Sequence, residues 1–153
     1  MDTSVSCREA TKGDLPQVLG LYSQPDFDSG EVLQLSEAED LFKRINSYPD
    51  YTIYVAVFED QIVGTFALLV MDNLGHKGAR SAIIEDVAVA PSFQRRGVGK
   101  QMMAYALQSA GKKGCYKAML SSNVSREKAH EFYESLGFAR HGYSYRTSTQ
   151  QGA

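Results

Sequence analysis

The sequence has no tryptophan, two cysteines and no block of five like charges. Cys7 and Cys115 are too far apart in sequence to indicate a metal-binding pair or a disulfide framework, so reduced thiols are expected. A net charge of −2 without charge blocks excludes an electrostatic footprint for nucleic acid or an anionic membrane. The longest apolar stretch, 66–71, cannot span a bilayer, and the opening residues do not resemble a signal peptide. We therefore expect a cytoplasmic protein with a small-molecule partner.

The composition is that of an ordinary globular domain, with 153 residues of which 43% are apolar and 22% charged. Nine tyrosines and seven phenylalanines supply the aromatic bulk that tryptophan would otherwise add to a core. We predict a single domain over 1–153, with 149–153 as a frayed end. His76, His130 and His141 are scattered without ligand spacing, so no metal site is expected.

Hydrophobic periodicity and turn residues predict alternating helices and strands, typical of an α/β fold (α+β by some schemes). A helix capped by Asp14 is expected to end near Tyr22, and 23–34 is expected to be a long loop. The other predicted helices cover 36–48, 98–112 and 125–136. The predicted strands cover 4–10, 51–58, 62–70, 81–90, 116–121 and 142–147.

A glycine-containing turn joins a predicted strand to a predicted helix, and it reads Q-R-R-G-V-G-K from Gln94 to Lys100. Glycine lets backbone amides approach an anion, and a helix amino terminus adds unpaired N–H groups and a favourable dipole. Arg95 and Arg96 add positive charge. Two glycines alone leave two interpretations open, a turn that serves only backbone geometry and a phosphate-binding turn.

The residues around this turn resemble the GNAT superfamily of acyl-CoA N-acyltransferases. The family motif Q/R-x-x-G-x-G/A follows a strand of the type apolar-x-V-x-P, and this chain reads V-A-V-A-P-S-F-Q-R-R-G-V-G. The family's second block, an alanine followed by F-Y and then G-F, is matched between Met119 and Phe138. The early segment C-R-E-A-T-K-G-D-L-P is similar to the family's first strand and helix cap. The resemblance covers almost the whole chain and implies that the turn holds the pyrophosphate of acetyl-CoA.

The resemblance also implies a fold and a set of cofactor contacts. The fold would be a mixed, twisted, mostly antiparallel sheet of six to seven strands with a splayed central pair, flanked by about four helices. Many members have asparagine where this chain has Arg126, whereas Asn123 stands three residues earlier, so the role of that asparagine is not assigned to either position. The cofactor-binding candidates are Val87, Ala88, Val89, Gln94, Arg95, Arg96, Gly97, Val98, Gly99, Lys100, Asn123 and Arg126.

Acetyl transfer to an amine needs a proton acceptor for the amine and a proton donor for the departing thiolate. Tyr133 matches a family tyrosine that donates a proton to the sulfur, and its phenol stays protonated near neutral pH. Glu85 and Asp86 lie on the strand before the turn and are the candidate bases, with Glu85 preferred; water acting alone is the alternative. As neighbours on a strand, the two carboxylates are expected to project to opposite faces.

The long loop 23–34 shapes the acceptor pocket in the family, so the substrate-binding candidates are Tyr22, Phe27, Asp28 and Glu31. The favoured function is transfer of acetyl to a primary amine of a small molecule by direct attack in a ternary complex. Acetylation of a protein amino terminus or lysine is an alternative, and so is a non-catalytic acyl-CoA-binding regulator. A homodimer is expected from the family resemblance.

Overall fold

The computed structural model describes residues 2–149. The chain divides into two compact units, Met1–Leu120 and Ser121–Ala153. The first unit carries the sheet and the second carries helix α4 (Glu127–Ser135). The predicted frayed end falls mostly on 150–153, which lie outside the described residues.

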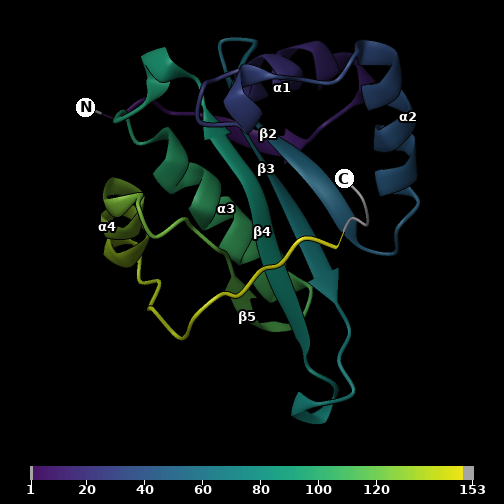
Figure 1. Cartoon of the computed structure of the whole chain (residues 1–153), viewed down its shortest axis with the longest axis vertical. Coiled ribbons are helices and arrows are strands. Elements are labelled where there is room, and N and C mark those ends of the chain that lie inside the picture. The colour runs from purple at the N-terminus through teal and green to yellow at the C-terminus, as the bar shows by residue number, and fades with distance from the viewer. Residues whose placement is uncertain (1, 150–153) are drawn as a thin grey trace. The chain divides into compact units, whose positions relative to one another are not determined.

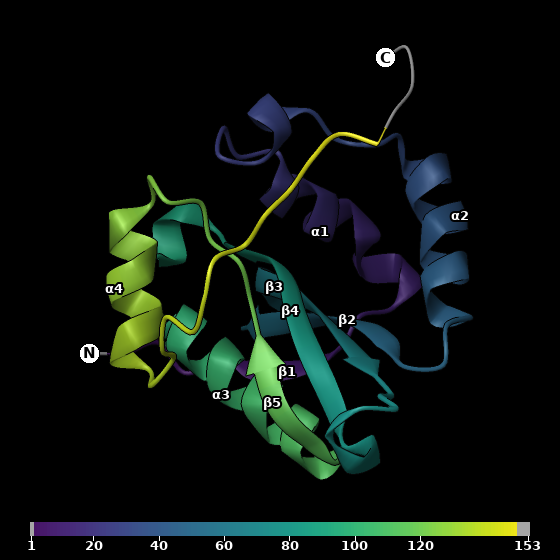
Figure 2. The same cartoon turned by 60° about the horizontal axis from the view of Figure 1, so that its bottom comes forward.

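The first unit alternates strands and helices around one sheet (Figure 1). Strands β1 to β4 pair antiparallel in chain order, and β5 pairs parallel to β4, so the sheet is mixed and mostly antiparallel as predicted. Helices α1 and α2 lie on one side of the sheet and α3 on the other (Figure 2). The elements are β1 (Ser6–Glu9), α1 (Leu15–Tyr22), α2 (Leu35–Asn46), β2 (Tyr51–Phe58), β3 (Gln61–Met71), β4 (Arg80–Val89), α3 (Val98–Lys112) and β5 (Cys115–Met119).

Strands β2 and β3 form a hairpin from the two segments predicted as strands over 51–58 and 62–70. Phe58 pairs with Gln61, which leaves Glu59 and Asp60 as the two central turn residues, with φ of 46° and 64°. Two consecutive positive φ angles define the type I′ turn, whose twist matches that of the flanking strands. The hairpin therefore fixes the register of the two longest-paired strands in the sheet.

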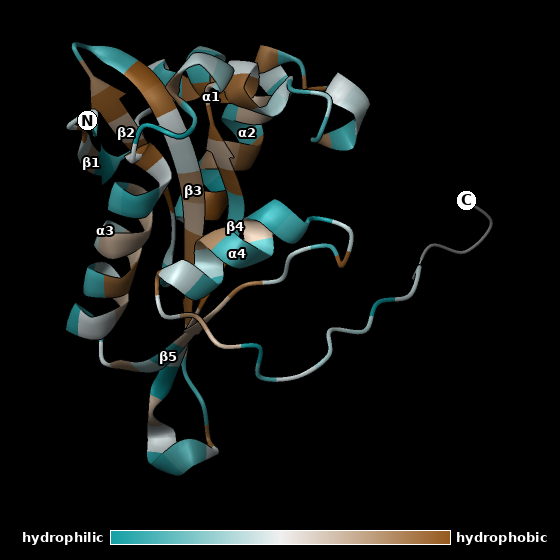
Figure 3. Cartoon of the chain, turned by 90° about the vertical axis from the view of Figure 1, so that its left-hand side faces the viewer, coloured by the Kyte–Doolittle hydropathy of each residue, from teal (hydrophilic) through white to brown (hydrophobic). Residues whose placement is uncertain are grey.

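Helices cover both sides of the sheet, and much of the strand ribbon in Figure 3 has the brown colour of hydrophobic residues. On the α3 face, Tyr54 and Phe66 stack with ring centroids 5.1 Å apart, and Tyr105 of α3 meets Tyr54 at 5.5 Å. On the α1 face, a buried cluster consists of Val18, Leu21, Val55, Ile62 and Ala88. The core thus holds β4 between two helical layers.

Strands β4 and β5 are paired at one end only. Their register runs from Arg80 opposite Cys115 to Ile83 opposite Met119, where β5 ends. Within the unit Met1–Leu120, residues 84–89 of β4 pair with β3 alone. The second half of β4 therefore has a free edge on its β5 side within this unit, while the splayed central pair stays a prediction.

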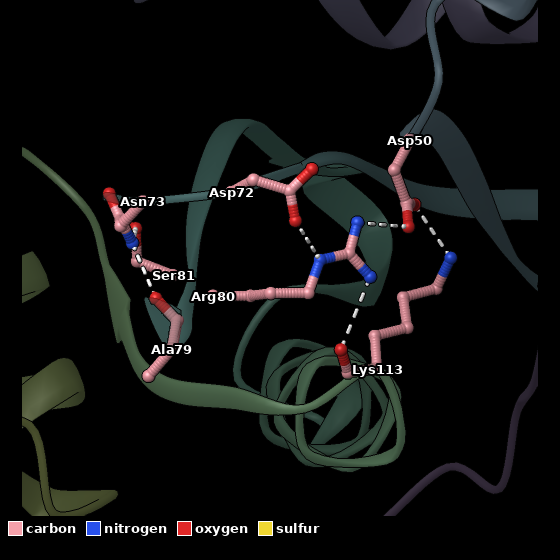
Figure 4. Close-up of polar contacts among 7 residues, drawn as sticks. All are labelled: Asp50, Asp72, Asn73, Ala79, Arg80, Ser81 and Lys113. Atoms are coloured by element: carbon pink, nitrogen blue, oxygen red, sulfur yellow. Dashed lines mark hydrogen bonds and ion pairs between the residues drawn. The ribbon is translucent and has the colours of Figure 1, made fainter. Parts of the chain in front are cut away.

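A network of ion pairs closes the other end of this strand pair (Figure 4). The Asp50 carboxylate accepts hydrogen bonds from Arg80 Nη2 at 3.2 Å and from Lys113 Nζ at 2.6 Å. Arg80 also donates through Nε to Asp72 at 3.1 Å and through Nη1 to the Lys113 carbonyl at 3.2 Å. Because Arg80 begins β4 and Lys113 precedes β5, the network holds the two strand starts together.

The strand predicted over 142–147 is wrong, and the sheet has five strands among the described residues instead of six to seven. The prediction used the alternating tyrosines Tyr143 and Tyr145, which have high strand propensity. A segment with high strand propensity forms a strand only where a partner strand is present. Within the described part of Ser121–Ala153, α4 is the only regular element, so the segment has no partner in its own unit.

Asp14 anchors the start of α1, although not as the predicted side-chain cap. Its buried carboxylate accepts hydrogen bonds from Arg8 Nη1 at 2.6 Å, Arg8 Nη2 at 3.0 Å and the Thr11 N–H at 2.7 Å. The bond from Arg8 is the main cause that lowers the pKa of Asp14 to about 2. The carboxylate therefore ties β1 to the turn before α1.

Replacing Asp14 with asparagine is expected to lower the free energy of unfolding at pH 7 by about 1–3 kcal/mol, because Arg8 and the Thr11 N–H lose a buried, charged acceptor. Because the pKa of Asp14 is lower in the folded state, its ionised carboxylate stabilises the fold above pH 3.8. This contribution to the free energy of unfolding is lost as the pH falls towards 2. Urea denaturation at pH 7 measures the loss of stability, and the same experiment at pH 2.5 measures how much of the loss disappears at low pH. The exposed control Asp40→Asn should change stability little; equal losses in both variants would contradict the prediction.

Candidate functional site

The free half of β4 is the first part of the site. Ala88 pairs with Thr65 and Val89 with Gly64 on the β3 side. On the β5 side, the backbone groups of this half have no strand partner within Met1–Leu120. An extended polar chain could therefore hydrogen-bond to backbone groups of Val87, Ala88 and Val89, the positions expected to hold a pantetheine arm, although the Val89 carbonyl already accepts from two glutamine side chains.

A β-bulge lies in the same half of β4. Glu85 pairs with Ala67 and Ala88 with Thr65, so Asp86 and Val87 together oppose Phe66. Asp86 has a φ of 53°, which is uncommon for a residue other than glycine. The bulge interrupts the alternation of side chains, so the expected projection of Glu85 and Asp86 to strictly opposite faces is wrong.

The turn from Gln94 to Lys100 has the backbone geometry of an anion site. Arg95 and Gly97 have φ of 59° and 79°, and α3 begins immediately afterwards at Val98. The first helical hydrogen bond runs from the Gln101 N–H to the Gly97 carbonyl at 3.2 Å. The N–H groups of Val98, Gly99 and Lys100 therefore have no acceptor within the helix and can bind an anion.

The two arginines of the turn have different surroundings. Arg95 is exposed. The Arg96 side chain donates to Thr3 Oγ1 at 2.8 Å, and its Cζ lies 4.4 Å from the centroid of the Phe93 ring. The Thr3 N–H donates to the Arg96 carbonyl at 2.7 Å. Arg96 therefore holds the N-terminal segment against the turn. Val98 is buried, so only its backbone N–H is available to a ligand.

Gly97 leaves no room for a side chain. A Cβ built there would lie 2.5 Å from Cγ of Asp2 and 2.6 Å from its Oδ2. The exposed Asp2 side chain can move away, so the positive φ is the main reason for glycine at this position.

The loop after α1 packs onto the end of β4. Tyr22 and Phe27 have ring centroids 5.4 Å apart and pack against the buried cluster that includes Ala88. Gln24 Nε2 donates to the Val89 carbonyl at 3.1 Å, and Gln94 Nε2 donates to the same carbonyl at 3.1 Å. These contacts bring the predicted acceptor loop, the free edge and the turn together, whereas Glu31 is exposed beyond the loop's tight turn.

The carboxylates around the bulge affect the pKa values of neighbouring titratable groups. Burial, and then the charge of Asp28, raise the pKa of Asp86. Burial raises the pKa of Tyr51, and both Asp86 and Glu85 add to the effect. Burial and then Asp86 also raise the pKa of Tyr22. The charge of Asp86 thus acts on Tyr22 and Tyr51, and the charge of Asp28 acts on Asp86, although both of these carboxylates are exposed.

Two residues near the candidate site were not identified from the sequence, Tyr51 beside the bulge and Gln24 in the acceptor loop. Tyr51 opens β2 and pairs with Leu69, which itself pairs with Ile83 of β4. Only the strand register relates Tyr51 to the bulge, and no local motif indicates it. Gln24 lies in a polar loop where nothing in the sequence distinguishes it from its neighbours.

The second unit holds three predicted site residues, which are described here within that unit. Tyr133 on α4 packs against Phe132 and Phe138, with ring centroids at 5.1 Å and 5.8 Å. Burial raises the pKa of Tyr133, and the charge of Arg126 opposes this. Asn123 Oδ1 accepts from the Ser125 N–H at 2.9 Å, so its side chain shapes the turn before α4. The cofactor roles of Asn123 and Arg126 stay predictions.

A polar cavity of about 410 Å³ lies elsewhere in the first unit. Its lining includes Glu9, Tyr48, Asp50, Tyr51 and Lys113. Lys113 follows the C-terminal end of α3, whereas the anion-binding turn precedes its N-terminal end, and a helix of that length spans about 22 Å. The cavity is therefore separate from the turn, and the ion-pair network beside it accounts for its polar lining.

The chain belongs to the GNAT acetyltransferase family, whose model matches residues 16–138. It is 38% identical over 81 residues to a glucosamine 6-phosphate N-acetyltransferase of Trypanosoma brucei brucei, covering 53% of each chain. It is 26% identical over 97 residues to an aminoalkylphosphonate N-acetyltransferase of Salmonella typhimurium, covering 63% of this chain and 62% of the relative. The chain thus spans about half to three fifths of the length of these curated relatives.

The fold is shared with solved structures. A putative acetyltransferase from Agrobacterium tumefaciens superimposes with a TM-score of 0.88 at 33% identity, covering 94% of this chain and 99% of the other. No helix of the described residues is long and apolar enough to cross a membrane. Among the same residues, no group of three or more His, Cys, Asp and Glu side chains is arranged to hold a metal ion.

Proposed function

We propose that this chain is an acetyl-CoA-dependent N-acetyltransferase that acetylates a primary amine of a small molecule. The observation that carries the proposal is the free edge of β4 leading directly into a glycine turn with unpaired helix N–H groups. The names of the glucosamine 6-phosphate and aminoalkylphosphonate relatives support a small amine as acceptor. The homodimer and the cytoplasmic location stay predictions.

The residues present fit acetyl-CoA, which would supply an activated acetyl thioester. The N–H groups of Val98, Gly99 and Lys100 would hold its pyrophosphate, and the β4 backbone from Val87 to Val89 would hold its pantetheine arm. A backbone N–H on the same strand would polarise the thioester carbonyl. Side chains at Gly97 and Gly99 would crowd this approach.

The remaining chemistry is proton transfer. The acceptor enters over Tyr22 and Phe27, and a carboxylate on β4 takes the proton from its ammonium, directly or through water. The amine nitrogen then forms a bond to the carbonyl carbon, and the carbon–sulfur bond breaks. The nitrogen loses its second proton to water, Tyr133 donates a proton to the departing sulfur and is reprotonated through that water, and the amide and free thiol leave.

Thiol release from acetyl-CoA in the presence of single amines tests the proposal. The panel contains glucosamine 6-phosphate, an aminoalkylphosphonate, a polyamine, an amino acid, an aminoglycoside and peptides with a free amino terminus or lysine. Turnover of a small amine is expected. Turnover of peptides alone would indicate a protein acetyltransferase, and tight acetyl-CoA binding without turnover of any acceptor would indicate a regulator; either result would overturn the proposal.

Replacing Tyr133 with phenylalanine is expected to lower kcat about tenfold with KM unchanged. The effect is below the usual range for acid catalysis because a thiol with a pKa near 8.5 is a good leaving group. The ring packing against Phe132 and Phe138 is kept in the variant. Steady-state kinetics measures this, with Phe132→Tyr as a control for added or lost hydroxyls on α4. An unchanged kcat would show that the hydroxyl has no catalytic role.

A further inference from the structure

The segment 2–5, which precedes β1, lies against the anion-binding turn and the first turn of α3. Thr3 is buried there, and each of its polar groups makes a hydrogen bond to this region. Its N–H donates to the Arg96 carbonyl at 2.7 Å, its hydroxyl accepts from Arg96 Nε at 2.8 Å, and its carbonyl accepts from Gln101 Nε2 at 2.6 Å. Three hydrogen bonds therefore join segments that are 93 to 98 residues apart in the sequence.

The side chain of Gln101 contacts both the turn and the segment 2–5. Besides its bond to Thr3, Nε2 donates to the Gly97 carbonyl at 3.1 Å, while Oε1 accepts from the Val5 N–H at 3.0 Å. The Gly97 carbonyl also accepts from the backbone N–H of Gln101 at 3.2 Å. One side chain thus connects α3, the turn and the segment before β1.

The carbonyls of Arg96 and Gly97, which accept these bonds, belong to the two peptide units on either side of the Gly97 Cα. Among the described residues no peptide bond is cis. A trans peptide unit is planar, and its C=O and N–H point in opposite directions. Fixing the Arg96 carbonyl therefore fixes the direction of the Gly97 N–H, which points away from Thr3. Fixing the Gly97 carbonyl likewise directs the Val98 N–H away from Gln101.

Glycine at position 97 permits the turn but does not hold it. Its φ of 79° is accessible to glycine, yet glycine also reaches many other conformations. An anion site depends on the direction of its N–H groups, because a hydrogen bond weakens steeply once its angle falls below about 120°. The bonds from Thr3 and Gln101 supply the restraint that glycine itself lacks.

We propose that Thr3 and Gln101 are positioning residues of the cofactor site, which hold the peptide units at Gly97 so that their N–H groups face the pyrophosphate of acetyl-CoA. The inference rests on the proposed function. The bonds exist in the protein without cofactor, so the turn does not have to be ordered on binding, and this lowers the cost of association. The segment 2–5 is then a functional part of the cofactor site.

Replacing Gln101 with methionine removes these side-chain bonds and keeps a similar length and helix propensity. Isothermal titration is expected to show about tenfold weaker binding of acetyl-CoA, the effect of roughly one hydrogen bond. With an amine that reacts, kcat at saturating acetyl-CoA should stay unchanged. Gln108→Met makes the same substitution at an exposed position of α3 and should bind normally. Wild-type affinity in a folded Gln101→Met protein, or an equal loss in Gln108→Met, would overturn the inference.

A pair of variants at Thr3 separates the hydroxyl from the packing of the buried side chain. Thr3→Val keeps the shape and removes the acceptor of Arg96 Nε, so acetyl-CoA should bind about threefold more weakly. Thr3→Ser keeps the hydroxyl and should bind like the wild type. Equal affinities in the two variants would show that the hydroxyl does not position the turn and would refute the role of Thr3.

The direction of the N–H groups can be measured without cofactor. Residual dipolar couplings of the backbone amides in the free protein are expected to change at Gly97 and Val98 in Gln101→Met and to stay the same in Gln108→Met. Unchanged couplings in Gln101→Met would contradict the inference directly. Because this measurement needs no ligand, failure of the wild type to bind acetyl-CoA would be recognised separately, as evidence against the proposed function.

Discussion

Replacing Gly97 with valine is expected to weaken acetyl-CoA binding at least about 100-fold, equivalent to about 2.7 kcal/mol. The φ of 79° disfavours any branched side chain, and the added atoms would meet the Asp2 carboxyl group. The turn must then shift, and the N–H groups of Val98, Gly99 and Lys100 move with it. Isothermal titration with acetyl-CoA measures the loss.

Two variants separate binding from folding in this experiment. Gly111→Ala lies near the other end of α3, where a Cβ meets nothing within 4 Å. It should bind normally and gain about 0.5–1 kcal/mol in stability from helix propensity. Combining Gly97→Ala with Asp2→Ala removes the collision and keeps the backbone strain, so binding should still be weak. A folded Gly97→Val protein with wild-type affinity would refute the cofactor turn.

Asp86 is one of the two candidate bases, and replacing it with asparagine is expected to lower kcat/KM by about 10²–10³ because this carboxylate could no longer accept the proton of the acceptor amine. Asparagine tolerates the left-handed backbone of the bulge, so the strand should keep its shape. Kinetics at saturating acetyl-CoA measures the loss, with Asp26→Asn as the loop control. A variant that keeps full activity at pH 7 would assign the base to Glu85 or to water.

The same variant is expected to be more stable than the wild type at pH 7. A raised folded pKa means that the fold prefers protonated Asp86, so its contribution is present below 3.8 and is lost as the pH rises through the folded pKa. Asparagine carries no charge to desolvate or to repel Asp28. Urea midpoints should therefore differ at pH 7 and converge below pH 3.8; a difference of the same size at both pH values would contradict this account.

Local signals account for what the sequence predicts well. The hairpin of β2 and β3 follows from two β-branched and aromatic runs separated by Glu59 and Asp60. The anion-binding turn follows from glycines placed between an apolar strand and a helix. Both features depend on interactions between residues within about ten positions of one another, so the local sequence is enough to predict them.

Features that depend on distant partners were not predictable in this way. The bulge at Asp86 depends on the register of β4 against Phe66 of β3, and no residue near Asp86 encodes it. The predicted strand around Tyr143 and Tyr145 failed because propensity does not supply a partner strand. Asp14 was expected to cap α1, but its carboxylate is bound by Arg8 of β1 and by Thr11.

The ion-pair network at the start of β4 fixes one end of the β4–β5 strand pair. Arg80, Asp50 and Lys113 hold the two strands together where they begin, whereas β4 continues towards Val89 beyond the end of β5. Successive residues of a strand advance about 3.3 Å, which places these ion pairs about 30 Å from the end of β4 that is proposed to receive the ligand. The strand that carries the proposed site is therefore anchored by side chains far from the proposed ligand.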